Sequence, residues 1–448
     1  MLFTRADAWP LDPDRTLADP CFDHAAIAAA APPPPATARP HNVLLITVDA
    51  LRADHAPPDG ARFMPAIAHL ATTAAVFRHA YAPAAMTIPS IAALHTGRHP
   101  WALAWGPTSI SADERVHYPA PAALWPRAWP GGRRVATPAF DRHPTLAERV
   151  GAAGHATGGF VSHENFLAPF GLGRGFTRYP AAIVREHNPR GVAITGAAVT
   201  DHTLAFIAEH RDRPWFAWAH YFDPHNPYRW PPGTDTTDDT PLARYRAEIL
   251  YTDVQIARLL LALDRAGLAD RTVVVFTADH GEAFGERGAE YHSSGLYEEL
   301  VRVPLLIRAP GLAPRVIDEP VSTVDIAPTL AAHLGVPLPT AQGRDLGPLL
   351  RGQPSPQAPI LAETIYRDYH RTYMLRDGHH KLIWDHLRGT RRLYDLAADP
   401  RETDNRIDAD PARAAALTAR LCAALHRTAR LDVPPAPPGP PVPLYADP

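Results

Sequence analysis

Three largely apolar runs predict buried strands of one sheet. They cover residues 42–48, 215–219 and 272–276 and are rich in Val, Ile, Leu, Trp and Phe. Strands buried on both faces have this continuous pattern, because helices cover both sides of a parallel sheet. Segments with helical periodicity alternate with these runs, for example residues 253–266. We therefore expect an α/β fold in which helices flank a large, mixed, mostly parallel central sheet.

The pattern changes after Gly352, where shorter apolar stretches predict a second kind of unit. A small α+β subdomain with an antiparallel sheet and one packing helix is typical of such a pattern. Its four short strands are expected at 360–364, 373–376, 381–384 and 392–396, and its helix from 411 to about 430.

Proline divides the chain further. It accounts for 51 of 448 residues and is concentrated near both ends, where it favours extended linkers. A Trp- and Pro-rich insertion has little periodicity, so we expect an irregular segment that forms either a substrate-side lid or an aromatic plug over the sheet. The predicted division is an N-terminal extension and linker at 1–40, a large domain at 41–352 with the insertion at 101–143, a subdomain at 353–432 and a proline-rich tail at 433–448.

Composition excludes several classes of protein. The formal charge of −3 argues against a nucleic-acid partner, for which a strong basic excess is expected. Two distant cysteines, Cys21 and Cys422, exclude a disulfide framework and a cysteine-rich metal site. No apolar run is long enough to predict a membrane span, and the first residues do not have the pattern of a secretory signal. A cytoplasmic location is therefore expected, unless the start codon is mis-assigned.

Two of the predicted strands end at side chains that can bind a metal. Asp49 follows the strand at 42–48, and Asp279 with His280 follows the strand that begins at residue 272. Ligands bind at the carboxyl ends of strands in open α/β sheets, so these side chains can converge on one cation. Each aspartate taken alone is explained equally well as a turn or helix cap.

A hydroxyl group lies between these two strands in the sequence. Thr87 is well placed to cap a helix that has Pro89 in its first turn and ends at Gly97. A hydroxyl at a helix N-terminus faces free N–H groups and the positive end of the helix dipole, which stabilise an alkoxide or a bound anion. Thr87 is therefore either a nucleophile or only a cap.

Further motifs, in the same order along the chain, resemble the sulfatase branch of the alkaline phosphatase superfamily. The resemblance runs from about residue 41 to 425 and depends on the ordered combination of motifs. It implies an alkaline-phosphatase-like fold and an enzyme that acts on phosphoric or sulfuric esters. The segments that carry it are 77–82, 145–148, 158–162, 173–176, 220–228, 297–305 and 393–396, with Asp399, Pro400 and Glu402.

The resemblance, together with the strand-end motifs, implies one tightly held divalent cation. Its predicted ligands are Asp49, Thr87, Asp279 and His280. Mostly oxygen ligands with one imidazole suit Mn²⁺, Mg²⁺, Ca²⁺ or Zn²⁺, and this set does not choose among them. A second metal that uses His225, Asp223 or His292 is an alternative.

The resemblance also implies substrate contacts. His225, in a His-x-Pro motif, is expected to stabilise or protonate an ester oxygen, and His292 is expected to face the bound anion. Arg52 is a candidate for supplying positive charge, with Asp54 as its partner, and His220 is a candidate substrate contact or a group that orients His225. Each histidine is also explained by a structural role in a loop.

Three departures from the sulfatase pattern change the expected chemistry. Thr87 replaces the Cys or Ser that is oxidised to formylglycine, Ile91 replaces an Arg, and Ala50 replaces the second Asp of the metal site. Threonine cannot yield that aldehyde, and at this point it resembles the phosphoryl-transferring relatives, including phosphonate hydrolases and phosphoethanolamine or glycerol-phosphate transferases. A phospho-threonine can be attacked by water or an alcohol, whereas a sulfated threonine turns over with difficulty.

The sequence therefore predicts a metal-dependent hydrolase or phosphotransferase with a Thr nucleophile. Its expected partner is a small-molecule, lipid-linked or glycan-linked phosphate or sulfate ester, and the residue chemistry favours a phosphoester or phosphonate. The alternatives are a sulfatase that acts without formylglycine and a non-catalytic, sulfatase-like binding protein. The sequence does not indicate the oligomeric state.

Overall fold

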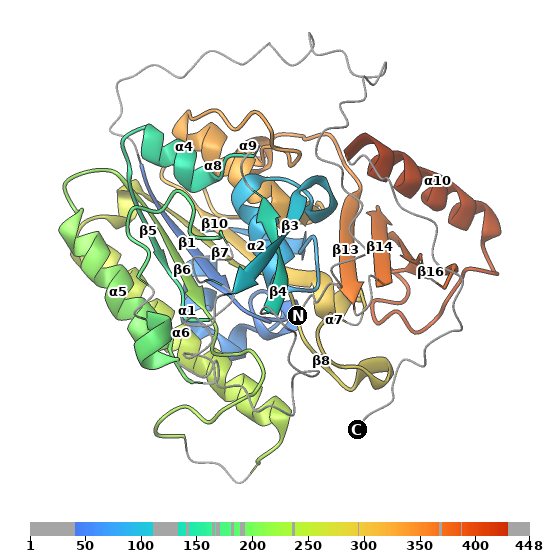
Figure 1. Cartoon of the computed structure of the whole chain (residues 1–448), viewed down its shortest axis with the longest axis horizontal. Coiled ribbons are helices and arrows are strands. Elements are labelled where there is room, and N and C mark those ends of the chain that lie inside the picture. Colours follow the sequence, from blue (N-terminus) through green and yellow to red (C-terminus); the bar gives the residue numbers. More distant parts are fainter. Residues whose placement is uncertain are drawn as a thin grey trace.

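A computed structural model describes most of the chain, and its central layer is the sheet that the sequence predicts (Figure 1). The described residues are 41–110, 133–139, 143–163, 166, 171–180, 183–188, 193–234, 238–293, 295–366, 370–386 and 388–428.

Within these residues, eight strands form the central sheet in the order β11-β2-β10-β7-β1-β6-β5, with β12 also paired to β2. Strands β5, β6, β1 and β7 run parallel to one another, and β10 runs antiparallel to both β7 and β2. The sheet is therefore mixed and mostly parallel, and this prediction is confirmed. The strands are β1 (Asn42–Val48), β2 (Ala75–Tyr81), β5 (Ala156–Phe160), β6 (Trp215–Tyr221), β7 (Thr272–Ala278), β10 (Arg302–Arg308), β11 (Arg315–Ile317) and β12 (Val321–Ser322).

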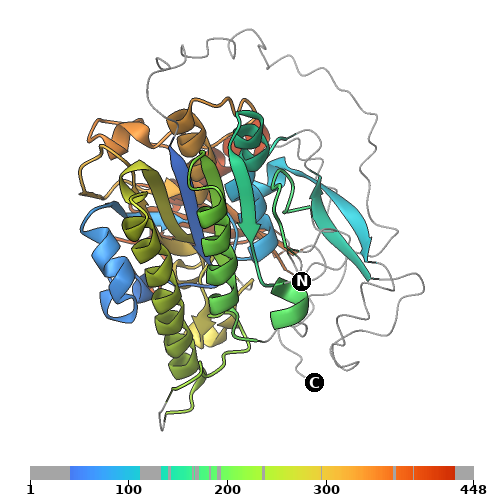
Figure 2. The ribbon, with the colours of Figure 1, turned by 90° about the vertical axis from the view of Figure 1, so that its left-hand side faces the viewer.

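Helices cover both faces of this sheet. Helices α1, α5 and α6 pack together on one face, and α2, α4 and α8 pack on the other (Figures 1 and 2). All seven residues of β1, β6 and β7 are buried, which explains why these strands lack polar alternation. The helices are α1 (Pro65–Ala71), α2 (Thr87–Thr96), α4 (Leu146–Ala152), α5 (Gly196–Glu209), α6 (Pro241–Arg265), α7 (Glu298–Val301), α8 (Ile326–Leu334) and α9 (Gly347–Leu350).

Helix α6 begins much earlier than the segment 253–266 that its periodicity suggests. Thr240 caps it by accepting a hydrogen bond from the backbone N–H of Ala243, and Pro241 occupies the first turn. Leu242, Tyr245 and Ile249 have helical spacing, but the buried face of these turns also contains the polar residues Glu248, Thr252 and Asp253, which interrupt the apolar pattern. The capping residues were the better signal for this boundary.

The C-terminal unit is a four-stranded antiparallel sheet covered by one helix, as predicted. Leu361, Leu375 and Leu382 face apolar residues of the helix, such as Leu417 and Leu421. The elements are β13 (Ile360–Tyr366), β14 (His370–Asp377), β15 (His380–Asp385), β16 (Thr390–Asp395) and α10 (Pro411–Thr428).

The predicted irregular insertion needs a correction. Within 101–143, β3 (Ala104–Ile110) and β4 (Arg133–Ala139) pair as an antiparallel ribbon. The ribbon is separate from the main sheet, and it contains Gly106, Pro107 and Pro138, residues that argue against a strand when only the sequence is read. Residues 111–132, the extension at 1–40 and the tail at 433–448 lie outside the described residues, and the proposed lid or plug role stays a prediction.

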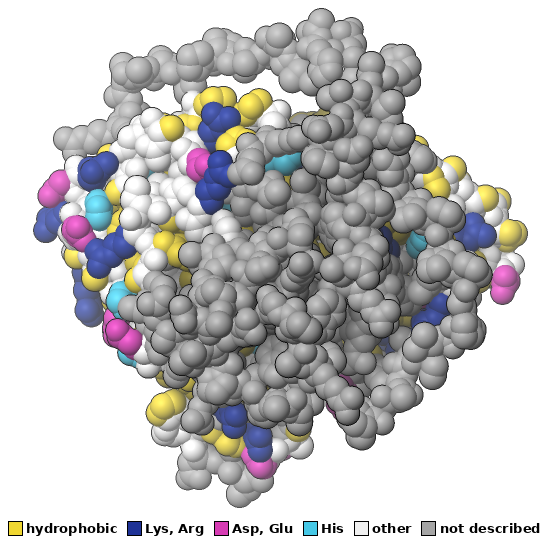
Figure 3. Space-filling model, in the orientation of Figure 1, with side chains coloured by type: hydrophobic (Ala, Val, Ile, Leu, Met, Phe, Trp, Pro, Cys, Tyr) yellow, Lys and Arg dark blue, Asp and Glu magenta, His cyan; other side chains and the backbone are white. Residues whose placement is uncertain are grey.

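Two observations concern membrane spans and the charge of one face. No helix in the described ranges is both long enough and apolar enough to cross a membrane. On the face shown in Figure 3, the described side chains of both charge signs are interspersed. This distribution agrees with the near-neutral net charge.

Candidate functional site

The carboxyl ends of three neighbouring strands build the site. Val48 at the end of β1 is in register with Ala278 of β7 on one side and Tyr221 of β6 on the other. Asp49 and Asp279 therefore follow adjacent strands at one edge of the sheet. Asp49, Asp279 and His280 each offer one ligand atom, and these atoms all lie within 4.8 Å of one another.

A chain of hydrogen bonds fixes one oxygen of Asp49. The indole N–H of Trp218 donates to Thr47 Oγ1 (2.9 Å), and the Thr47 hydroxyl contacts His220 Nδ1 (2.8 Å). A carboxylate only accepts hydrogen bonds, so His220 donates from Nε2 to Asp49 Oδ2 (3.3 Å). When the ring carries this one proton, Nδ1 accepts the hydrogen of the Thr47 hydroxyl. The other oxygen, Asp49 Oδ1, is buried and has no hydrogen-bond partner in the described structure.

Asp279 shows the same division between its two oxygens. Its Oδ1 accepts the backbone N–H groups of Ala50 (3.2 Å) and His280 (2.9 Å), and its Oδ2 is buried without a partner among the described residues. Ala50 adopts a left-handed conformation (φ 56°), which costs about 1 kcal/mol or more and turns its amide toward Asp279. Burial and the neighbouring Asp49 carboxylate raise the pKa of Asp279 well above its ordinary value.

The His280 imidazole is held in one orientation. Its Nδ1 donates to the carbonyl oxygen of Gly281 (2.8 Å), which leaves the lone pair of Nε2 facing the two carboxylates. Burial lowers the pKa of His280 to about 3, so the ring is neutral. Residue 281 is glycine because a Cβ there would collide with the backbone carbonyl of Glu299.

These donors fit a divalent cation. Asp49 and Asp279 each have one unpartnered buried oxygen in the described structure, and the Nε2 lone pair of His280 faces both, with the Thr87 hydroxyl as its hydrogen-bond partner. Buried carboxylates without a partner are costly unless a cation neutralises them. Two oxygen ligands and one imidazole suit Mn²⁺, Mg²⁺, Ca²⁺ or Zn²⁺.

Thr87 lies beside this donor set. Its Oγ1 is 3.2 Å from His280 Nε2, and only 6% of the residue is exposed. The structure corrects its expected role as a helix cap: Met86 is the N-cap residue, Thr87 is the first residue of α2, and no side chain makes a capping bond. The threonine hydroxyl is therefore available to the site rather than used by the helix. Gly97 ends α2 in a left-handed conformation (φ 66°), as predicted.

Two further histidines line the same space. The rings of His280 and His292 are 4.4 Å apart, and those of His292 and His225 are 4.9 Å apart. His225 Nδ1 donates to the carbonyl of Asn226 (2.5 Å), and His292 Nδ1 contacts Glu282 Oε1 (3.1 Å). Burial lowers the pKa of His225, and it lowers that of His292 to about 4. The structure thus brings both predicted histidines to the metal ligands.

Three other candidates have different surroundings. Arg52 forms ion pairs with Asp54 and Glu286 and donates to the backbone carbonyl of Glu282. Asp223 accepts the backbone N–H groups of Thr195 and Gly196 at the start of α5, so its oxygens cap a helix. His220 is fully buried behind Asp49. The contacts of all three are with the protein itself.

Sequence reasoning missed one residue of the site, Glu282. Its carboxylate is fully buried and lies between the hydroxyl of Tyr228 (3.0 Å) and Nδ1 of His292 (3.1 Å). Burial raises the pKa of Glu282 to about 7. The available signal was a carboxylate two residues after His280 at the end of a buried strand.

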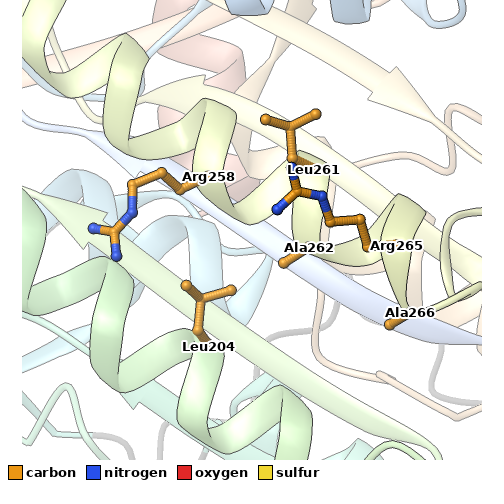
Figure 4. Close-up of a pocket in the computed structure, with 6 residues that line it drawn as sticks. All are labelled: Leu204, Arg258, Leu261, Ala262, Arg265 and Ala266. Carbon is orange, nitrogen blue, oxygen red and sulfur yellow. The ribbon is translucent and has the colours of Figure 1, made fainter.

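A separate shallow groove lies on the outer side of α5 and α6 and has a volume of about 490 Å³. It contains no acid, hydroxyl or imidazole side chain, so it offers no group for ester chemistry. Its lining residues, shown in Figure 4, are Leu204, Arg258, Leu261, Ala262, Arg265 and Ala266.

Comparison with known proteins finds sulfatases and related hydrolases. Choline-sulfatase of Rhizobium meliloti (strain 1021) is 33% identical over 165 residues, which are 36% of this chain and 32% of that protein. Arylsulfatase A of Homo sapiens is 34% identical over 193 residues, 40% of this chain and 38% of that protein. The matched region thus spans about a third of the length of these relatives.

Solved structures share the fold over most of the chain. Phosphonate monoester hydrolase of Agrobacterium radiobacter superposes with a TM-score of 0.66 and 21% identity, and covers 87% of this chain and 96% of its own. A 2-O GAG sulfatase superposes with a TM-score of 0.67 and 20% identity, over 87% and 93%. These matches confirm the alkaline-phosphatase-like fold.

Two family models match the chain directly. The model described as N-sulphoglucosamine sulphohydrolase, C-terminal, matches residues 285–430. The model described as Sulfatase matches residues 41–336, which is more than half of the chain and contains every residue of the site above. This protein therefore belongs to the sulfatase family.

Proposed function

We propose that this protein is a metal-dependent hydrolase or transferase that uses Thr87 to attack a phosphoester or phosphonate. The observation that carries the proposal is the Thr87 hydroxyl, which makes no capping bond and lies 3.2 Å from His280 Nε2, beside two unpartnered carboxylate oxygens. A cation held by Asp49, Asp279 and His280 would lower the pKa of that hydroxyl and offset the negative charge of the ester.

The identity of the nucleophile favours phosphorus over sulfur. Threonine cannot form the aldehyde hydrate with which formylglycine releases sulfate, and Ile91 supplies no guanidinium beside it. When the Thr87 oxygen bonds to phosphorus, the bond from phosphorus to the leaving oxygen breaks. Water or an alcohol can then attack phosphorus in the phospho-threonine and restore the free hydroxyl. The product is a hydrolysed ester or a transferred phosphoryl group, respectively.

The surrounding groups can supply charge and protons for both steps. The first backbone hydrogen bond of α2 runs from Ser90 N–H to Met86 O, so the N–H groups of Thr87 and Ile88 are not used by the helix. Such N–H groups at a helix N-terminus can donate to a bound anion. His225 and His292 are neutral in the free site because burial lowers the pKa of each. An anionic ester favours their protonated form, from which Nε2 can donate a proton to the leaving oxygen.

A sulfate ester is the second candidate substrate. The relatives that support it are named as sulfatases, including choline-sulfatase and arylsulfatase A. The same cation, imidazoles and helix terminus suit a sulfate as well as a phosphate. Only the turnover of a threonine adduct distinguishes the two.

Substitution of Thr87 tests the proposal. Thr87→Ala should lower turnover by at least about 10³-fold, the scale expected for loss of a nucleophile. The fold should survive, since the side chain makes no capping bond. Thr87→Ser should retain appreciable activity because only a methyl group is lost. Initial rates should be measured on aryl phosphates, phosphodiesters, phosphonates and sulfates, with and without each divalent metal.

Mass spectrometry supplies the decisive observation. A slowly hydrolysed phosphoester should leave a phosphoryl group on Thr87, and the Thr87→Ala protein should remain unmodified. Full activity of Thr87→Ala with normal metal content would rule out the threonine mechanism. Turnover of sulfates alone would favour the second candidate, and no turnover of any ester would favour a binding protein.

A further inference from the structure

A buried carboxylate connects two parts of the site that are distant in sequence. Glu282 Oε1 lies 3.1 Å from His292 Nδ1, and its Oε2 accepts the hydroxyl proton of Tyr228 at 3.0 Å. The Glu282 side chain is fully buried, and Arg52 holds its backbone carbonyl. The mechanism proposed above gives Glu282 no contact with the ester.

This contact determines how His292 presents its ring. An ionised Glu282 oxygen only accepts hydrogen bonds, so in that state Nδ1 of His292 carries the proton that points at Glu282. The opposite ring nitrogen, Nε2, then faces away from Glu282. The His292 ring packs against those of His280 (4.4 Å between centroids) and His225 (4.9 Å).

The backbone on both sides of His292 adopts strained conformations. Tyr291 and Ser293, its two neighbours, both adopt left-handed conformations, with φ of 64° and 76°. Each costs about 1–3 kcal/mol for a residue other than glycine, and such strain persists only where the surroundings hold it. The hairpin of β8 (Ala283–Phe284) and β9 (Glu290–Tyr291) holds one side, and Thr364 donates to the Ser293 carbonyl (3.3 Å) on the other.

We propose that Glu282 is a positioning residue that keeps His292 in the Nδ1–H tautomer, with Nε2 directed at the bound ester. The inference rests on the proposed function for its role in turnover, because His292 acts there on an ester oxygen. The orientation itself depends only on the hydrogen bonds. An outer carboxylate that fixes an imidazole is a known way to set its tautomer and basicity.

Two variants of Glu282 separate positioning from simple packing. Glu282→Met keeps the length of the side chain but removes both acceptors, and Glu282→Gln keeps one acceptor for His292. We expect Glu282→Met to lower kcat about 10–100-fold with normal metal content, and Glu282→Gln to recover much of that loss. Tyr228→Phe is the matched control: it removes only the partner of Oε2 and should have a smaller effect.

A double-mutant cycle gives the readout that packing alone would not produce. In a His292→Ala background, Glu282→Met should change kcat by less than about 3-fold, because the residue it positions is gone. An equal loss in both backgrounds would show that Glu282 acts on the fold or on other groups, and would overturn the proposal.

Histidine ¹⁵N spectroscopy tests the orientation without any substrate. The His292 signal, assigned by its loss in His292→Ala, should show a protonated Nδ1 in the wild-type protein and mixed tautomers in Glu282→Met. An unchanged tautomer would overturn the positioning role whatever the reaction is. If no phospho-threonine forms but the tautomer changes as expected, only the proposed function fails.

Discussion

Two buried ionic clusters of this protein differ in one respect, the presence of a balancing cation. In the site, Asp49 and Asp279 each keep one oxygen without a partner, and the pKa of Asp279 is raised by burial and by Asp49. Between the large sheet and the C-terminal unit, Lys381 Nζ lies 2.9 Å from oxygens of both Glu298 and Glu402. Burial acts to raise the pKa of Glu298, but the pair with Lys381 outweighs it and lowers that pKa.

The two clusters show how a structural group of charges differs from a functional one. The Lys381 cluster carries its own cation, and the second oxygens of its carboxylates also have donors, from Tyr81 and from the backbone of Glu298. The fold thus places an ammonium or a donor beside each of these oxygens, although Glu402 Oε1 has only its ion pair with Lys381 and burial still raises the pKa of Glu402. No described Lys or Arg side chain forms an ion pair with Asp49 or Asp279, so that cluster needs either a bound cation or a proton on Asp279.

The largest effect is expected when one charge of the Asp49 and Asp279 cluster is removed. Asp279→Asn keeps the acceptor for Ala50 and His280 but removes the charge that faces Asp49. Bound divalent metal should be lost, and kcat/KM should fall by about 10³-fold or more, since a bound cation supplies several kcal/mol of charge stabilisation. Elemental analysis and initial rates measure this. Metal content equal to that of the wild-type protein would contradict the assignment.

The stability of the metal-free protein tests the same difference between the two clusters. The chelator-treated Asp279→Asn protein should be no less stable than the chelator-treated wild-type protein, because one of two facing carboxylates has been neutralised. Added divalent cation should stabilise only the wild-type protein, in proportion to the logarithm of its concentration. Urea denaturation with and without metal measures both effects. A metal-free Asp279→Asn protein that is clearly less stable than the metal-free wild-type protein would contradict the expectation.

The second-largest effect is expected when the ammonium group of the Lys381 cluster is removed. Lys381→Met leaves Glu298 and Glu402 buried without their cation, and should lower the free energy of unfolding by about 3–5 kcal/mol. Metal content should not change. Arg78→Met is the matched control, because its ion pair with Asp318 is exposed and should contribute below about 1 kcal/mol. Urea denaturation measures both, and equal losses would remove the distinction.

The smallest expected effect concerns a third buried carboxyl group that has neither a metal nor a basic partner. Glu248 on α6 is 1% exposed, accepts the N–H of Arg229 with Oε1 (2.8 Å), and has no described partner for Oε2. Burial raises its pKa to about 10. Here the fold tolerates a carboxyl group by keeping it protonated.

The pH dependence of stability follows from that pKa. Between about pH 4.3, where an unfolded Glu titrates, and pH 10, the unfolded chain has lost the proton that folded Glu248 keeps. The stabilising contribution is complete below this window and is lost as the pH rises through it, by at most about 1.4 kcal/mol per pH unit. Glu248→Gln should remove this slope in urea denaturation at pH 6, 7 and 8. An equal pH dependence of the free energy of unfolding in the two proteins would refute this assignment to Glu248.

Local patterns predicted three strands of the central sheet and the four strands of the C-terminal unit, whereas β2, β5 and β10 were not predicted. The apolar runs at β1, β6 and β7 predicted buried strands, and the side chains at their ends converge because parallel neighbours end at one edge of the sheet. Asp49, Asp279 and His280 were predicted in this way, whereas Thr87 was predicted from the start of a helix. The ribbon of β3 and β4 was not predicted, because its glycine and prolines weaken the strand pattern.

The amino-acid sequence was enough to predict three central strands, the presence of flanking helices and the residues at two strand ends, because burial imposes a hydrophobic pattern on neighbouring residues. Only the tertiary structure decided which loop side chains meet them. Glu282 meets both Tyr228 and His292, His220 lies behind Asp49, and Arg52 is held by Glu286. These partners are polar, and most are far apart along the chain. Their pairing depends on where the folded backbone places single atoms, and this leaves no periodic trace in the sequence.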